Sequence, residues 1–202
     1  MRILYGSMFR WIGTKRGEIS AIFAVIALLY IYFGKTTPVD IFNPRSSLLF
    51  WIFWPCYLLG VFFRIWAAGL INKNAEVSRT GIYRLVRHPL YLGTLLIYLS
   101  FFLVIGNILL GIVLVILMAL IIYYPRMLQE ERVLLRSFPS VYQKYSQVTP
   151  RLFPKFSALS LALQDGGFSI QKAYKNLRFR SLWGIIMMPF FYEAVIRIIR
   201  AV

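Results

Sequence analysis

Apolar residues fall in long runs that are separated by short polar and charged stretches. Residues 19–34 carry no formal charge, and neither do residues 46–63. Beyond Arg64, the apolar character of the second run continues to residue 71. A membrane-spanning helix needs about 20 mostly apolar residues, so each run approaches the length of one span. The pattern predicts two membrane helices in the first part of the chain.

The longest run without a formal charge covers residues 88–125 if His88 is neutral. It is about twice as long as one span, so it must fold back on itself. Gly106 and Asn107 lie near its centre, and both residue types tolerate the left-handed backbone of a tight turn. The run therefore predicts a short helical hairpin. Residues 181–202 are also apolar, although they include three charged side chains, and they predict a further span.

Composition supports a membrane protein. The chain has 202 residues, of which 59% are hydrophobic and 15% are charged, and its 23 Lys and Arg against 7 Asp and Glu give a net charge of +16. In an apolar chain, this charge favours an anionic membrane face over nucleic acid as the partner. One cysteine, Cys56, and one histidine, His88, exclude an internal disulfide and a cysteine- or histidine-clustered metal centre.

The basic residues predict the orientation, because short cytoplasmic loops are enriched in positive charge. Residues 1–17 and 72–87 hold four Lys and Arg each, residues 125–180 hold ten, and the connection after the first span holds two. We therefore predict an all-α polytopic membrane protein with about five transmembrane helices and a cytoplasmic N-terminus. The predicted divisions are N-terminal membrane helices at 1–71, a core at 72–156, and a basic interfacial segment with a last membrane helix at 157–202.

The first candidate motif, TGIYRLVRHPLYLG, covers residues 80–93. Pro89 suits the first position of a helix, which makes His88 the capping residue. The amides of Leu90 and Tyr91 would then point out of the helix start, where the dipole favours a carboxylate or phosphate. The alternative interpretation is that the basic residues before Pro89 anchor the helix at lipid headgroups.

The second motif follows the hairpin at residues 125–156. Pro125 can begin a helix, on which Arg126 and Glu130 would share one face. Glu131 would point about 100° away, to orient the helix or a neighbouring arginine. The alternative is an ordinary surface ion pair on an amphipathic helix.

Together, the two motifs resemble the membrane methyltransferases that include isoprenylcysteine carboxyl methyltransferase and the phospholipid N-methyltransferases. The resemblance covers about residues 60–155, and the matching positions are Gly81, Tyr83, Arg87, His88, Pro89, Tyr91, Gly93, Glu130, Glu131, Phe138, Tyr142, Tyr145, Pro150 and Pro154. The chain departs from the pattern at Pro139, where the family usually has glycine, and residues 157–202 have no recognised counterpart.

The resemblance implies S-adenosylmethionine as the cofactor, in a pocket that opens to the cytoplasm. The cofactor-binding residues that it implies are Ala75, Glu76, Val77, Ser78, Tyr83, His88, Pro89, Leu90, Tyr91 and Glu130. Glu130 would accept hydrogen bonds from the ribose hydroxyls, and Arg126 would face the methyl acceptor.

The resemblance implies methyl transfer to a lipid or lipid-linked acceptor. A guanidinium at Arg126 favours an anionic acceptor, either a carboxylate or a phosphate. Three alternatives stay open: N-methylation of a phospholipid amine, a nicotinamide-dependent membrane reductase that uses the basic residues 172–180, and a non-catalytic membrane scaffold. Residues 168–180 themselves predict a basic amphipathic helix at the membrane interface. The sequence does not specify the acceptor or the oligomeric state.

Overall fold

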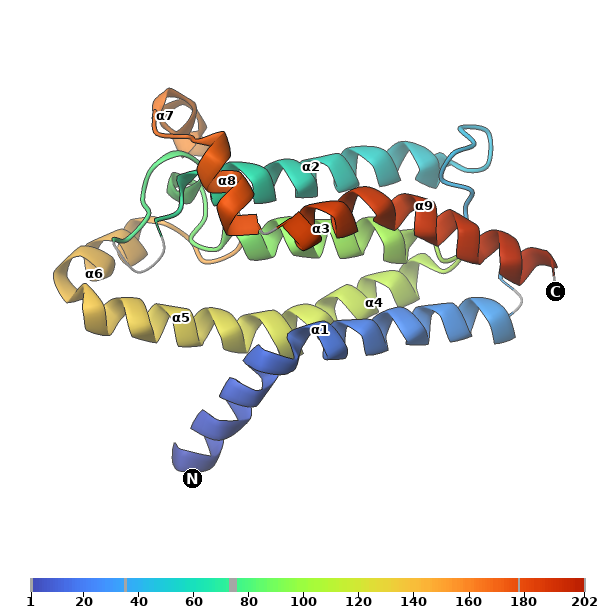
Figure 1. Cartoon of the computed structure of the whole chain (residues 1–202), viewed down its shortest axis with the longest axis horizontal. Helices are drawn as coiled ribbons and strands as arrows, with labels where there is room; N and C mark the ends of the chain where they lie inside the picture. The colour runs from blue at the N-terminus through green and yellow to red at the C-terminus, as the bar shows by residue number, and fades with distance from the viewer. Residues whose placement is uncertain (1, 35, 73–75, 178, 202) are drawn as a thin grey trace. The chain divides into compact units, whose positions relative to one another are not determined.

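The computed structural model describes residues 2–34, 36–72, 76–177 and 179–201, without the side chains of 2–14, 16 and 179–182. Over these residues the fold is all-helical and contains no strand (Figure 1), which confirms the predicted class. The α-helices are α1 (Arg2–Phe33), α2 (Leu48–Leu70), α3 (Pro89–Leu103), α4 (Ile108–Met118), α5 (Tyr124–Ser137), α6 (Pro139–Val148), α7 (Leu159–Gln164), α8 (Ile170–Leu177) and α9 (Phe179–Ala201). Three short turns complete it: the 3-10 helices η1 (Gly81–Arg84) and η3 (Phe156–Ala158), and the π-helix η2 (Ala119–Tyr123).

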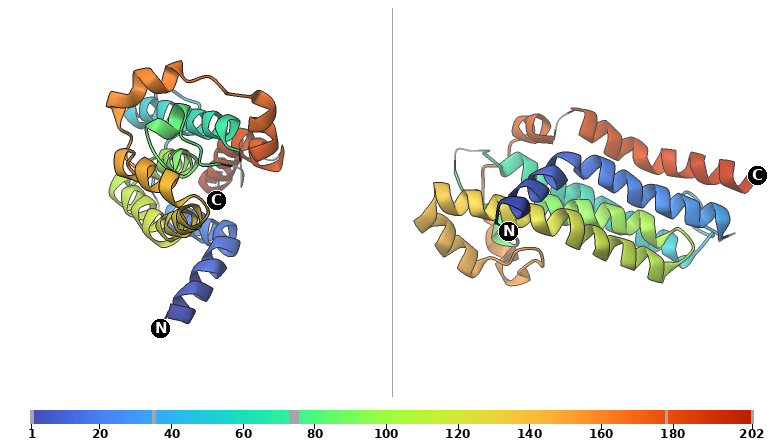
Figure 2. Two further views of the ribbon diagram at one scale, coloured as in Figure 1. Left: turned by 90° about the vertical axis from the view of Figure 1, so that its left-hand side faces the viewer. Right: turned by 90° about the horizontal axis from the view of Figure 1, so that it is seen from below.

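The chain forms two compact units. Unit 1 consists of Met1–Tyr57, Ile97–Gln129 and Met187–Val202, and unit 2 consists of Leu58–Leu96 and Glu130–Ile186. Within unit 1, α1 runs beside α4 and η2, as the two views of Figure 2 also show. Both motifs contribute most of their residues to unit 2. The division of the sequence into three segments stays a prediction.

The predicted helical hairpin is confirmed. Gly106 has a φ of +90°, and Asn107 caps α4 by accepting a hydrogen bond from the Leu110 amide at 3.0 Å. The two arms approach closely, because a Cβ atom on Gly111 would lie 2.2 Å from the carbonyl oxygen of Phe102. A side chain larger than hydrogen at this position would therefore push α3 and α4 apart.

The prediction that Pro125 begins a helix was wrong. α4, η2 and α5 follow one another as a single helical stretch, Ile108–Ser137, and Pro125 lies inside it. A proline in a helix has no amide hydrogen to donate, and its ring crowds the carbonyl one turn earlier. The π-helix η2 ends two residues before Pro125, and such a turn is a common way to accommodate this interruption.

Two helices in the described part of the chain are long and apolar enough to cross a membrane, Leu48–Leu70 and Ile108–Ser137. Gly17–Phe33 and Pro89–Leu103 are apolar but shorter. The last helix, α9, contains a buried glutamate, Glu193, whose carboxylate accepts a hydrogen bond from Arg197 at 3.0 Å. Five transmembrane helices therefore stay a prediction.

In unit 2, α2 and α3 pack closely through small residues. A Cβ atom on Gly93 would lie 2.6 Å from the carbonyl oxygen of Gly60. Beside this contact, Arg64 donates a hydrogen bond to the hydroxyl of Thr94, which in turn donates to the Leu90 carbonyl at 2.8 Å. Arg64 thus has a polar partner within the helix pair.

Of the basic amphipathic helix predicted at residues 168–180, residues Ile170–Leu177 form the helix α8. Its apolar residues Ala173 and Leu177 are buried against Ala68 and Leu90. The side-chain amide of Asn176 donates to the carbonyl oxygens of Ala68 and Ile71, at 2.9 and 3.0 Å. These contacts cap the end of α2, where helix carbonyls otherwise lack partners.

Candidate functional site

His88 is held by backbone contacts on both sides. Its carbonyl accepts hydrogen bonds from the amides of Tyr91 and Leu92, at 3.1 and 3.0 Å, so α3 begins where the sequence predicts. Its own amide donates to the Arg151 carbonyl at 3.3 Å, and the amide of Arg87 donates to the Pro150 carbonyl at 2.9 Å. The segment after α6 therefore runs beside the start of α3.

These contacts correct one expectation. The Tyr91 amide donates to the His88 carbonyl, so it does not point out of the helix start as a free donor for an anion. The Tyr91 amide is used within the first turn of α3, where it forms a hydrogen bond of the 3-10 type. Such bonds are common at helix ends.

Glu131 is the centre of a buried cluster of charged groups. Arg151 donates to both carboxylate oxygens, from Nε to Oε1 at 2.9 Å and from Nη2 to Oε2 at 2.8 Å. Nη1 of Arg87 lies 3.2 Å from Oε1 of Glu131, and Nε2 of His88 lies 3.0 Å from the same oxygen. The Glu131 side chain is only 11% exposed. Two arginines and a histidine thus converge on one carboxylate, and the paired contact from Arg151 fixes its orientation.

This cluster determines the role of each nitrogen of His88. An ionised carboxylate only accepts hydrogen bonds, so Nε2 of His88 carries the hydrogen that faces Glu131. The opposite ring nitrogen, Nδ1, lies 3.9 Å from Oε2 of Glu130. The imidazole ring therefore stands between the two neighbouring glutamates.

Glu130 has a more open environment. The hydroxyl of Tyr91 donates to its Oε1 at 2.5 Å, and the Glu130 side chain is 39% exposed. The rings of His88 and Tyr91 stack with their centroids 5.7 Å apart and their planes at 24°. A carboxylate that remains accessible to solvent thus lies beside two aromatic rings, and both rings come from the other motif.

Two buried tyrosines connect the remaining motif residues. The hydroxyl of Tyr145 donates to the Tyr83 carbonyl at 2.7 Å, and that of Tyr83 donates to the Ala67 carbonyl at 3.4 Å. Burial raises the pKa of both phenols well above the ordinary value, so both remain hydrogen-bond donors at neutral pH. Val77 packs against Tyr145 and Tyr142.

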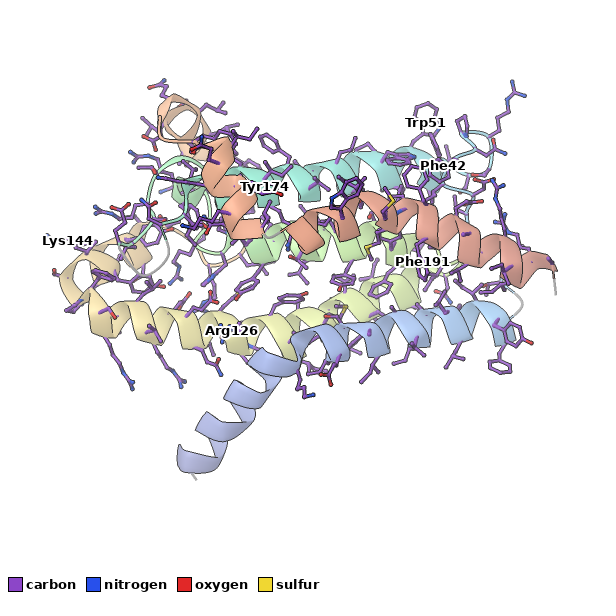
Figure 3. All side chains as sticks on the ribbon, viewed as in Figure 1. Phe42, Trp51, Arg126, Lys144, Tyr174 and Phe191 are labelled. Atoms are coloured by element: carbon purple, nitrogen blue, oxygen red, sulfur yellow. The ribbon has the colours of Figure 1, made fainter. Side chains whose placement is uncertain are left out.

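The other predicted residues are distributed as follows. Pro89 is buried, Leu90 and Ser78 are half-buried, and Glu76 is exposed and accepts a hydrogen bond from Asn72. Ala75 lies outside the described residues. Arg126 belongs to unit 1, where its Nη1 donates to Oε1 of Gln129 at 3.2 Å, and Figure 3 labels it on α5. Unit 2 therefore brings together His88, Tyr91 and Glu130.

Sequence reasoning missed Arg151 as the main partner of Glu131. The signal was present in the composition, because a chain with 23 Lys and Arg and 7 acids provides a basic partner for a buried glutamate. The identity of that partner depends on the return of the chain after α6, which no local pattern specifies. In the described residues, no group of three or more His, Cys, Asp and Glu side chains is arranged to hold a metal ion.

Comparison with known proteins matches a region that contains the first motif and the beginning of the second. Residues 47–140 match the family model of phospholipid methyltransferases. Over 97 residues the chain is 35% identical to the cobalt-zinc-cadmium resistance protein CzcN of Cupriavidus metallidurans, a match that covers 46% of this chain and 44% of that protein. The chain thus spans less than half the length of that curated relative. No solved structure matches. The resemblance to membrane methyltransferases is confirmed, and the matched range contains His88, Glu130 and Glu131.

Proposed function

We propose that this protein is a membrane enzyme that transfers the methyl group of S-adenosylmethionine to a lipid or lipid-linked acceptor. The match of residues 47–140 to phospholipid methyltransferases supports this reaction class. The observation that carries the site is the 3.9 Å separation of His88 Nδ1 from Glu130 Oε2, with Tyr91 hydrogen-bonded to Glu130. Residues about 40 positions apart in the sequence thereby meet at one small surface, where the Glu130 side chain is exposed and those of His88 and Tyr91 are buried beside it.

The residues at this surface fit the proposed cofactor. S-adenosylmethionine supplies an activated methyl group on a sulfonium ion. Glu130 has the exposure and the acceptor oxygens to bind vicinal hydroxyls such as those of a ribose. The aromatic side chains of His88 and Tyr91 beside this carboxylate are of the type that contacts an adenine ring or a cationic sulfur. Glu131 binds no ligand in this proposal, because Arg87, His88 and Arg151 already occupy it; it holds His88 in place.

Arg126 is proposed to bind the methyl acceptor. A guanidinium forms paired hydrogen bonds to a carboxylate or phosphate, and such an anion needs no base before it attacks a methyl group. An amine acceptor would have to lose a proton, and of the two glutamates only Glu130 retains an exposed carboxylate for that task. The protein then contributes mainly proximity and alignment of donor and acceptor.

The membrane arrangement is part of the same proposal. Five spans with a cytoplasmic N-terminus would place both motifs at the cytoplasmic face, where a water-soluble cofactor meets a lipid acceptor. The large excess of Lys and Arg at residues 1–17, 72–87 and 125–180 supports this orientation.

Isothermal titration of the purified protein in neutral detergent with S-adenosylhomocysteine tests the cofactor site. We expect micromolar binding that Glu130→Gln weakens and that Glu18→Gln, the same change at an exposed residue of α1, leaves unchanged. Transfer of a labelled methyl group into total lipid extract, followed by mass analysis, then identifies the acceptor as an anion or an amine. Binding of a nicotinamide cofactor in place of S-adenosylhomocysteine would contradict the proposal.

A further inference from the structure

A concave surface in unit 2 is lined by none of the residues that are proposed to bind the cofactor. It is a cavity of about 700 Å³ whose lining includes neither His88, Tyr91 nor Glu130. Its walls come from three segments that are separate in the sequence: residues 79–84 around η1, residues 144–149 at the end of α6, and residues 155–161 of η3 and α7. This cavity therefore needs its own explanation.

The cavity is strongly basic. Arg79, Arg84, Lys144 and Lys155 line it, and no carboxylate is among its lining residues. Arg84 is paired with Asp165, to which its Nη2 donates at 3.1 Å. Arg79, Lys144 and Lys155 form no ion pair with any residue that the structure describes. Like charges around one hollow repel each other unless an anion occupies it, so the lining favours a negatively charged ligand.

Contacts within unit 2 hold the walls of the cavity. The Gly81 amide donates to Oδ2 of Asp165 at 2.8 Å, which ties the end of α7 to η1. The Lys155 amide donates to the Leu85 carbonyl at 2.8 Å, and the hydroxyl of Tyr145, itself a lining residue, donates to the Tyr83 carbonyl at 2.7 Å. The cations are thus carried by a fixed framework, although their own side chains are exposed; Figure 3 labels Lys144 on α6.

The same cavity has an apolar border. Val148 and Leu161 line it and are 64% and 54% exposed. The neighbouring side chains of Phe156 and Leu163, on η3 and α7, are also exposed. A soluble phosphate needs only the cations, whereas an amphiphile also covers exposed apolar side chains. We propose that this cavity binds the phosphate head group of an anionic phospholipid, with Arg79, Lys144 and Lys155 as its ligands and Val148 and Leu161 beside its acyl chains.

This lipid would be a bound membrane component and not the methyl acceptor, so the inference goes beyond the proposed function. Its test uses the whole protein in neutral detergent, titrated with four probes: dihexanoyl phosphatidic acid, dihexanoyl phosphatidylcholine, glycerol 3-phosphate and inorganic phosphate. The variant combines Arg79→Gln, Lys144→Gln and Lys155→Gln. The control removes the same charge from exposed positions of unit 2 with Arg132→Gln, Arg136→Gln and Lys175→Gln. Thermal unfolding checks that both proteins are folded.

We expect the wild-type protein to bind phosphatidic acid at least about tenfold more tightly than phosphatidylcholine or either soluble phosphate. The cavity variant should lose about tenfold or more of this affinity, since each basic residue near an anionic surface contributes about fivefold, while the control should change little. Equal losses in both proteins would overturn the proposal in favour of a diffuse charge effect. Equal binding of glycerol 3-phosphate would overturn the lipid assignment.

Saturating S-adenosylhomocysteine separates this proposal from the preceding one. If the two sites are distinct, the affinity for phosphatidic acid stays the same in its presence, and the cavity variant still binds S-adenosylhomocysteine. Competition between the two ligands would show that the cavity belongs to the cofactor site and would overturn the inference. If no S-adenosylhomocysteine binds at all, the proposed function fails, while binding of phosphatidic acid by the cavity is still measured independently.

Discussion

Glu130 and Glu131 are adjacent on α5 and both lie beside His88, but they differ in exposure and in their other contacts. The carboxylate of Glu131 is almost fully covered and contacts Arg87, His88 and Arg151, whereas that of Glu130 is 39% exposed and accepts a hydrogen bond from Tyr91. Because successive residues of a helix point about 100° apart, one side chain faces the protein interior and the other faces its edge. A Glu-Glu pair therefore combines a residue that maintains the structure with a residue that is available to a ligand.

The difference also explains how the site is assembled. Glu131 draws together the start of α3, through Arg87 and His88, and the segment after α6, through Arg151. His88 is then fixed on one side by Glu131 and presents Nδ1 towards Glu130 on the other. The buried contact between Glu131 and His88 thus orients His88 towards the exposed Glu130. Residues behind a binding site orient those that contact the ligand in the same way.

The largest effect is expected on removal of the buried charge. Glu131→Gln keeps the shape of the side chain but leaves Arg87 and Arg151 without their counter-ion. Breaking a buried ion pair at one partner costs about 3–5 kcal/mol. Because this cluster is slightly exposed, we expect the free energy of unfolding to fall by about 3 kcal/mol, the lower end of that range. Chemical unfolding in detergent, followed by tryptophan fluorescence, measures the loss. An equal loss of stability in Glu130→Gln would show that Glu130 and Glu131 contribute equally to the folded state and would contradict the comparison.

Glu130→Gln should change ligand binding more than stability. The glutamine can still accept the hydrogen bond of Tyr91, so we expect the free energy of unfolding to fall by less than about 1 kcal/mol. Loss of a charged acceptor for two hydroxyls should weaken S-adenosylhomocysteine about 10- to 100-fold. Titration calorimetry measures this change, and Tyr91→Phe is the companion variant, since it removes only the hydroxyl that orients the carboxylate. Unchanged affinity in Glu130→Gln would remove the proposed role of Glu130.

The contrast between neighbouring residues was only partly accessible from the sequence. The start of α3 at Pro89, the turn at Gly106 and the amphipathic helix α8 were correctly predicted, because proline, glycine and apolar spacing act on the backbone within a few residues. Helical spacing also predicted that Glu130 and Glu131 face different ways, but not which of them is buried.

What could not be predicted depends on contacts between distant segments or on competition within a helix. The pairing of Arg151 with Glu131 requires the return of the chain after α6, and the Arg84–Asp165 pair joins residues 81 positions apart. Pro125 was expected to begin a helix because that is its locally preferred position, but the π-turn before it allows the helix to continue. A single-residue preference was thus overridden by an adjustment in the neighbouring turn.

A third residue of α5, Arg126, is proposed to contact the methyl acceptor and not the cofactor. Arg126→Gln should leave the affinity for S-adenosylhomocysteine within about twofold and reduce the rate of methyl transfer about tenfold, because the lost guanidinium is proposed to bind only the acceptor. Arg132→Gln, an exposed change on the same helix, is the matched control. Normal turnover in Arg126→Gln would contradict the acceptor assignment, and a parallel loss of cofactor affinity would assign Arg126 to the cofactor instead.

The smallest effect is expected at the ion pair between Arg84 and Asp165, which is the exposed counterpart of the Glu131 cluster. The hydrogen bond that Arg84 donates to the Asp165 carboxylate holds the pKa of Asp165 below the ordinary value of 3.8. A carboxyl group whose pKa is lowered by folding stabilises the folded state at neutral pH, and this contribution disappears as the pH falls through the lowered pKa. Because Arg84 is exposed and solvent screens the pair, Asp165→Asn should cost less than about 1 kcal/mol at pH 7. Thermal unfolding midpoints of the two proteins should converge in acid. A difference that persists below the lowered pKa would show that the effect of the substitution does not come from the charge of Asp165.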